Sequence, residues 1–172
     1  MKRVQGSATV KLLECVNPVK NKWRVRWDVQ TEDGGLASYM EEEFAYRPAE
    51  EEIKALIISW QNEQTDEKIL KGFVYQGEEV WLSTENQFNY KAAYDLAVQT
   101  EGKTLPVTFK FGTDEEPIYH EFATLEELAD FYTKAMNHVQ TSLEEGWKKK
   151  ENINLTAYGN QSDLRFARLP SA

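Results

Sequence analysis

Apolar and polar positions alternate through the first 47 residues, and this pattern predicts an antiparallel β-meander. Residues 22–30 (KWRVRWDVQ) alternate strictly, with two Trp and two Val on one face and mainly charged side chains on the other, which is the period of a half-buried strand. The turn signal Asp33-Gly34-Gly35 predicts a hairpin that returns through residues 36–46. The apolar, β-rich segment 8–16 predicts one further strand.

Side-chain pairing predicts the register of this hairpin. A two-residue loop at Asp33-Gly34 puts apolar side chains opposite each other on one face and opposite charges together on the other, and both kinds of pair are favourable. We expect the arginines of this strand to be neutralised by glutamates on the polar face. The predicted pairs are Trp27 with Met40, Trp23 with Phe44, Arg26 with Glu41, and Arg24 with Glu43.

Residues 48–71 predict a connecting helical segment. Pro48 and three acidic residues suit a first helical turn, and apolar positions then recur at helical spacing at Ile53, Leu56, Ile57 and Trp60. Residues 65–72 predict a second, short helix with Thr65 or Asp66 as its N-cap.

Residues 72–155 predict a ββαββα unit. A hairpin around Gln76-Gly77 leads into a helix capped by Ser83 or Thr84, and a strand pair follows at 105–112 and 117–122. A capping box, Thr124 with Glu127, opens a long helix whose end is weakened by Gly146. The apolar stripe of this helix is Leu125, Leu128, Tyr132, Ala135, Met136, Val139, Leu143 and Trp147.

The predicted fold class is therefore α+β. An N-terminal antiparallel β-meander is followed by a connecting helix and by a ββαββα unit with a long C-terminal amphipathic helix. The predicted division is 1–47 for the meander, 48–71 for the connecting segment, 72–155 for the ββαββα domain and 156–172 for a loose tail.

Composition narrows the classes of function. The net charge of −9 argues against a general phosphate-backbone binder, so we expect no nucleic-acid partner. The apolar segments are too short to span a membrane and the start carries no signal-peptide pattern. We expect a cytoplasmic or virion-associated protein without membrane association.

Candidate catalytic residues do not form a motif. Cys15 lies in an apolar strand, His120 lies in a strand, and His138 lies one position off the apolar stripe of the long helix. Phosphate loops, GxSxG and HExxH are absent. We predict no catalytic residue, no metal ligand and no cofactor, and the sequence favours a protein that is not an enzyme.

The stretch 80–99 (VWLSTENQFNYKAAYDLAVQ) mixes aromatic and amide side chains and is the best candidate for a binding site. Helical geometry assigns Gln87, Lys91, Asp95 and Gln99 to solvent, and Phe88, Ala92 and Leu96 to the core. Asn89 then falls inside an apolar arc, with aromatic residues at its edge. The candidate binding residues are Trp81, Asn89, Tyr90 and Tyr94.

Residues 72–153 carry a series of short motifs: FVYQGEEVWLS, TENQFNYKAAYDLA, LPVTFKFGTDEEPIYHEF, TLEEL and HVQTSLEEGWKKKENI. This part of the chain resembles the domain of unknown function found near the C-termini of bacteriophage and prophage tail-fibre and tail-associated proteins. Many members have a Trp in the third strand, where this chain has Phe109 and Phe111. The resemblance implies a phage or prophage context and protein assembly, with no cofactor and no catalytic residue.

Two classes of function follow. The first is a non-enzymatic, phage- or prophage-derived interaction protein in tail-associated complexes, which binds a protein partner or itself through the long helix near residues 125–147. The alternative is a small-molecule-binding or enzymatic domain that uses a cleft beside residues 81–94. A third, weaker hypothesis is an acidic mimic of nucleic acid.

Overall fold

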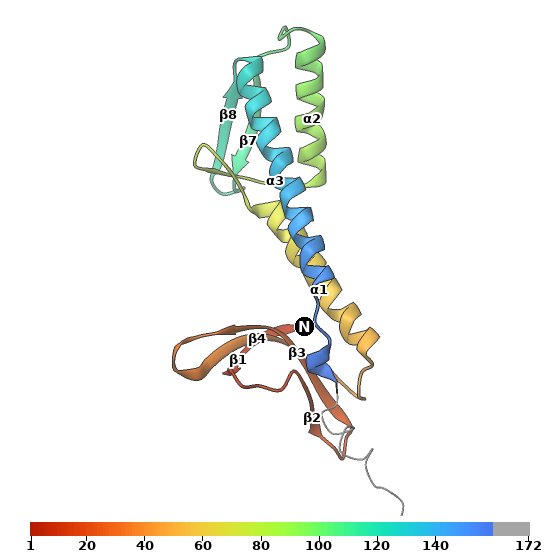
Figure 1. Ribbon diagram of the computed structural model, residues 1–172. Coiled ribbons are helices and arrows are strands. Elements are labelled where there is room, and N and C mark those ends of the chain that lie inside the picture. Colours follow the sequence, from red (N-terminus) through yellow and green to blue (C-terminus); the bar gives the residue numbers. More distant parts are fainter. Residues whose placement is uncertain (160–172) are drawn as a thin grey trace, which may run out of the picture. The chain divides into compact units, whose positions relative to one another are not determined.

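The computed structural model describes residues 1–159 and confirms the α+β fold class (Figure 1). The described chain divides into two compact units, one made of residues 1–59 with residues 152–159, and one made of residues 60–151. Residues 160–172, which include most of the predicted tail, lie outside the described residues.

The first unit contains a four-stranded antiparallel sheet with the order β1-β4-β3-β2. The meander β2-β3-β4 is the predicted one, whereas the segment predicted as a strand at 8–16 is shared between a loop and β2. Residues 2–7, which were not predicted as a strand, pair with β4. The strands are β1 Lys2–Ser7, β2 Leu13–Asn17, β3 Lys22–Thr31 and β4 Leu36–Phe44.

The predicted hairpin register is confirmed for all four pairs, from Trp23 with Phe44 to Trp27 with Met40. The predicted two-residue loop is wrong. The chain turns through a 3₁₀ helix, η1 (Asp33–Gly35), and the register shifts by one residue after Trp27. Asp28 has a φ of 50° at this irregularity, so a bulge in β3 compensates for the longer turn.

One of the two charge pairs on the polar face of this hairpin is buried, whereas the pair of Arg24 with Glu43 is partly exposed. Arg26 is 4% exposed and Glu41 is 5% exposed, and Arg26 Nε donates to Glu41 Oε2 at 2.8 Å. Arg26 Nη1 also donates to Glu14 Oε2 and to the Lys11 carbonyl, each at 2.8 Å. The loop between β1 and β2 thus reaches this face and buries an ion pair that has several hydrogen bonds.

Residues outside the sheet complete the core of the first unit. Ile53 and Ile57 of α1 (Glu50–Lys71) are buried, as is Tyr158 of a second 3₁₀ helix, η2 (Thr156–Tyr158). The Tyr158 hydroxyl donates to the Arg26 carbonyl oxygen at 2.7 Å. Residues 156–158, predicted to begin a loose tail, therefore form an ordered turn that is hydrogen-bonded to β3.

The connecting segment is one continuous helix, α1, and the predicted break at residues 65–66 does not occur. Thr65 does not cap a second helix, because its hydroxyl donates to the Gln61 carbonyl oxygen at 2.9 Å within the helix. Thr65 is buried, and a Cβ placed on Gly146 would collide with its Oγ1 atom. Gly146 lies inside a helix that continues to Glu151, where it permits close approach to α1.

The second unit has the predicted ββαββα order. The predicted caps are present: Ser83 Oγ accepts from Asn86 N–H at 3.1 Å, Thr124 Oγ1 accepts from Glu127 N–H at 3.2 Å, and Glu127 Oε2 accepts from Thr124 N–H at 3.1 Å. Its elements are β5 Phe73–Tyr75, β6 Glu78–Val80, α2 Thr84–Gln99, β7 Val107–Gly112, β8 Pro117–Phe122 and α3 Leu125–Glu151.

Aromatic side chains form the core of this unit around Phe131 of α3, which is fully buried. The ring centroids of Tyr75, Tyr90 and Phe122 lie 5.0–5.1 Å from that of Phe131. Three different elements therefore meet at one side chain. Much of the apolar stripe predicted on α3 is used inside the unit, with Leu128 and Ala135 buried against this cluster.

Among residues 1–159, the helices lack the combination of length and apolar composition that crossing a membrane requires.

Candidate functional site

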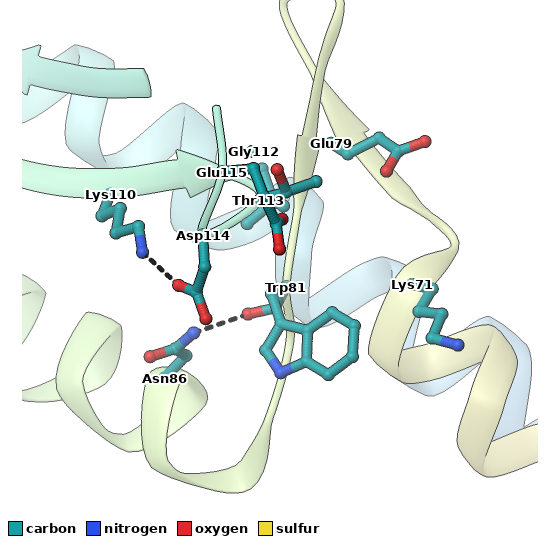
Figure 2. A pocket seen from close by; sticks show the side chains of 10 residues that line it. Lys71, Glu79, Trp81, Asn86, Lys110, Gly112, Thr113, Asp114 and Glu115 are labelled. Atoms are coloured by element: carbon teal, nitrogen blue, oxygen red, sulfur yellow. Dashed lines mark hydrogen bonds and ion pairs between the residues drawn. The ribbon is translucent and has the colours of Figure 1, made fainter. Parts of the chain in front are cut away.

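A cavity of about 460 Å³ opens beside Trp81 in the second unit. It lies where the end of α1, strand β6, the start of α2 and the turn between β7 and β8 meet (Figure 2). Its walls combine one aromatic ring with charged and amide side chains. The lining residues are Lys71, Glu79, Val80, Trp81, Asn86, Lys110, Gly112, Thr113, Asp114 and Glu115.

Trp81 directly follows β6 and presents its indole ring to this cavity, with 45% of the residue exposed. Asn86, in the first turn of α2, donates from Nδ2 to the Trp81 carbonyl oxygen at 2.8 Å (Figure 2). Lys71 Nζ lies 5.9 Å from the centre of the ring, within the range of a cation–π interaction. The hydrogen bond from Asn86 therefore fixes the backbone of Trp81, and the Lys71 ammonium group lies next to its ring.

The charged groups of the cavity are largely paired. Lys110 Nζ and Asp114 Oδ1 lie 2.5 Å apart, and their hydrogen bond lowers the pKa of Asp114 and raises the pKa of Lys110. Asp114 therefore stays ionised and Lys110 protonated at neutral pH. Neither group is poised to exchange a proton at neutral pH.

The predicted binding residues are not brought together. Trp81 lines the cavity, but Tyr90 is buried in the aromatic core, with its ring centroid 4.6 Å from that of Phe109. Tyr94 stacks on Tyr132 at 4.9 Å. Asn89 is exposed to solvent, because the apolar arc in which it lies is not buried, and this corrects that prediction. Burial raises the pKa of Tyr90 to about 12, consistent with a core residue.

The described residues also hold no group of three or more His, Cys, Asp or Glu side chains arranged for a metal ion. His120 packs against Phe122 with ring centroids 4.5 Å apart. His138 Nε2 lies 3.0 Å from the Lys68 carbonyl oxygen, and its ring lies 5.6 Å from that of Phe73. Both histidines have structural neighbours.

Comparison with known protein families matches residues 52–165 to the domain of unknown function DUF4376. The chain belongs to the DUF4376 family. This result confirms that the chain contains a domain of unknown function, and the match starts 20 residues before the region predicted from the motifs. No curated protein and no solved structure matches the chain.

Helix α2 of the DUF4376 region is rotated from the predicted orientation, although Lys91 and Gln99 are exposed as predicted. Phe88 and Leu96, predicted to lie in the core, are 70% and 50% exposed. Gln87, predicted to face solvent, is half-buried, and its Nε2 donates to the Leu82 carbonyl oxygen at 2.8 Å. Tyr90 and Ala97 take the buried positions.

Phe88, Ala92 and Leu96 therefore form a line along the exposed side of α2, which we call the outward strip. The three residues are spaced by four along the helix and all are exposed. Figure 1 shows α2 beside α3 at the margin of the second unit. Lys91 and Asp95 flank the strip and form an ion pair at 2.5 Å.

Several residues of the cavity could not be found from the sequence. Lys71, Lys110 and Asp114 come from α1, β7 and the following turn, and they meet only in the folded DUF4376 region. Each is an ordinary surface charge in its local sequence. Trp81 carried a signal, because it belongs to the stretch 80–99, in which aromatic and amide side chains are mixed.

Proposed function

We propose that this DUF4376 protein is a non-enzymatic interaction protein, derived from a phage or prophage, with a structural or assembly role in tail-associated complexes. The context is supported by the resemblance of residues 72–153 to domains of tail-fibre and tail-associated proteins. The interaction role is supported mainly by one observation, the outward strip on α2. The fold leaves three apolar side chains uncovered there.

The exposure of this strip is more than ordinary surface variation. Single exposed apolar residues are normal in proteins, but neighbouring ones on one helix face form a patch of the kind that binds partners. Phe88, at 70% exposure, has the aromatic character that is enriched in interface centres. The strip lies on α2, so the proposed interaction surface differs from the long helix that the sequence suggested.

The cavity does not favour catalysis over binding. Its best-placed acid and base, Asp114 and Lys110, stabilise each other in their charged forms. Lys71 Nζ lies 5.9 Å from the centre of the Trp81 ring, within the range of a cation–π interaction. These features support recognition rather than proton transfer.

The proposed role is tested in the phage or prophage that encodes the chain. A tagged copy is expressed from its own locus, particles are induced, and tails and tail-assembly intermediates are separated on density gradients. We expect the tagged chain to co-fractionate with the tail tube protein, and Phe88→Ser to reduce this association at least fivefold. Absence of the chain from both fractions would overturn the proposal.

The alternative, a small-molecule-binding or enzymatic domain, is favoured by the cavity beside Trp81. An indole face next to the amide of Asn86 and the carboxylate of Asp114 suits a neutral, hydroxyl-rich ligand. The test is to titrate the chain with neutral oligosaccharides and to follow the indole N–H signals by NMR. A selective shift of the Trp81 signal, abolished by Trp81→Ala but not by Trp147→Ala, would support this second function.

A further inference from the structure

We propose that the partner of the outward strip is a second copy of this chain, with the two α2 helices packed antiparallel about a two-fold axis at Ala92. The inference rests on the proposed function and names the partner of the same surface. It follows from the arrangement of side chains along α2, which complements itself in this orientation and not in the parallel one.

The apolar residues match first. An antiparallel helix pair centred on Ala92 brings Phe88 of one copy opposite Leu96 of the other, and the reverse. The two Ala92 residues then face each other, and their small side chains allow the helices to approach closely. At the ends of the strip, Glu85 lies opposite Gln99 of the second copy, and this amide can donate to the carboxylate.

The charges match as well. A two-fold axis perpendicular to both helices brings the same flank of each helix together. Lys91 and Asp95 share one flank, 100° or less from the centre of the strip. In the antiparallel pair Lys91 therefore lies near Asp95 of the second copy, and Asp95 lies near the Lys91 of that copy. The contact contains two opposite-charge pairs.

A parallel pair lacks this complementarity. In a parallel pair, the flank of one helix that carries Lys91 and Asp95 would face the other flank of the second helix. That flank carries Asn89 and has no charged residue to pair with Lys91 or Asp95. Lys91 already bonds Asp95 within its own helix at 2.5 Å, and its ammonium group has further donors for a second carboxylate. The orientation is therefore specified by charge and the register by the apolar strip.

The interface is small. A helix of 16 residues is about 24 Å long, and a single helix pair of this length buries less than the roughly 1,200 Å² of stable complexes. We therefore expect weak, reversible pairing that becomes effective when copies are held close together, as in an assembly.

Charge reversal tests the pairing in the full-length chain. Lys91→Asp and Asp95→Lys each place like charges across the two-fold axis, so each variant alone should associate at least tenfold more weakly than the wild type. An equimolar mixture of the two restores opposite charges and should associate at least as strongly as the wild type. Sedimentation equilibrium between about 10 μM and 1 mM, at low salt, measures all four samples.

Two further variants test the apolar match and the axis. Leu96→Ala should weaken association at least tenfold, whereas Val74→Ala, an exposed apolar residue of β5, should not change it. In a Cys15→Ser background, Ala92→Cys should form a disulfide-linked dimer under mild oxidation, and Glu101→Cys should not. Circular dichroism of each variant shows that the fold is retained.

The outcomes separate this inference from the proposed function. A wild-type chain that stays monomeric to 1 mM, or a mixture that associates no better than its components, overturns self-pairing. If that chain still co-fractionates with tails and Phe88→Ser releases it, the strip binds a foreign protein and only the self-pairing is wrong. A chain that dimerises as expected but is absent from tails supports the pairing and overturns the tail role.

Discussion

The crossing of α1 and α3 offers the sharpest test of the packing. Gly146 is buried in α3, and a Cβ placed there would collide with Thr65 Oγ1 and lie 3.1 Å from Thr65 Cγ2. Thr65 cannot move aside easily, because its hydroxyl is bonded to the Gln61 carbonyl oxygen and a β-branched side chain has few rotamers in a helix. The added methyl group must therefore displace a helix.

Two opposing effects determine how much Gly146→Ala changes the free energy of unfolding. Alanine in place of glycine within a helix normally stabilises by about 0.5–1 kcal/mol, and overpacking a tight contact costs about 1–3 kcal/mol. We expect Gly146→Ala to be destabilising by roughly 1 kcal/mol in the wild-type background. In a Thr65→Ala background the clashing atoms are absent, so the same substitution should be stabilising by about 0.5–1 kcal/mol.

Urea unfolding, followed by circular dichroism at 222 nm, measures the four proteins of this double-mutant cycle. The two sites touch, so their coupling free energy should be about 1–3 kcal/mol. A coupling below about 0.5 kcal/mol, or stabilisation by Gly146→Ala in both backgrounds, would show that the two helices do not approach here as described.

Two further predictions concern the two cores. Glu41→Ala leaves the buried Arg26 without its best partner and should reduce the free energy of unfolding by about 3 kcal/mol, while Glu43→Ala, which removes an exposed carboxylate, should change it little in the same urea titration. Because burial raises the pKa of Tyr90 to about 12, above about 10 in the unfolded chain, its stabilising contribution is complete below pH 10 and is lost between pH 10 and 12. Tyr90→Phe should therefore remove about 1.4 kcal/mol of the destabilisation seen between pH 8 and pH 11, and an unchanged pH dependence would contradict the burial of this hydroxyl.

The features that were predicted correctly depend on residues that are close to each other in the sequence. The register of the β3–β4 hairpin was correct because Trp, Met, Arg and Glu side chains restrict which positions can face each other. The loop was wrong because a bulge at Asp28 can add a residue without changing that pairing. The caps at Ser83 and Thr124 were correct because they require only the next three residues.

The predictions that were wrong concern side chains whose contacts are distant in the sequence. Two arcs of α2 are almost equally apolar, and the choice between them is made by Phe109 and Phe131, whose rings pack against Tyr90. The predicted break at Thr65 ignored Gly146, 81 residues later, whose missing side chain lets a buried threonine fit inside a helix. The cavity beside Trp81 could not be predicted, because its charged residues come from separate elements.

The family match and the compact units divide the chain at different places. The DUF4376 match begins at residue 52, so it excludes the sheet formed by β1 to β4. Yet Ile53, Ile57 and Tyr158, which lie inside the match, are buried in the unit that contains this sheet. The Tyr158 hydroxyl even bonds the backbone of β3, at Arg26. The sheet is thus an addition whose core uses both ends of the family domain. Removing it would expose three apolar side chains, so binding by the outward strip must be measured on the whole chain, where no artificial apolar surface competes.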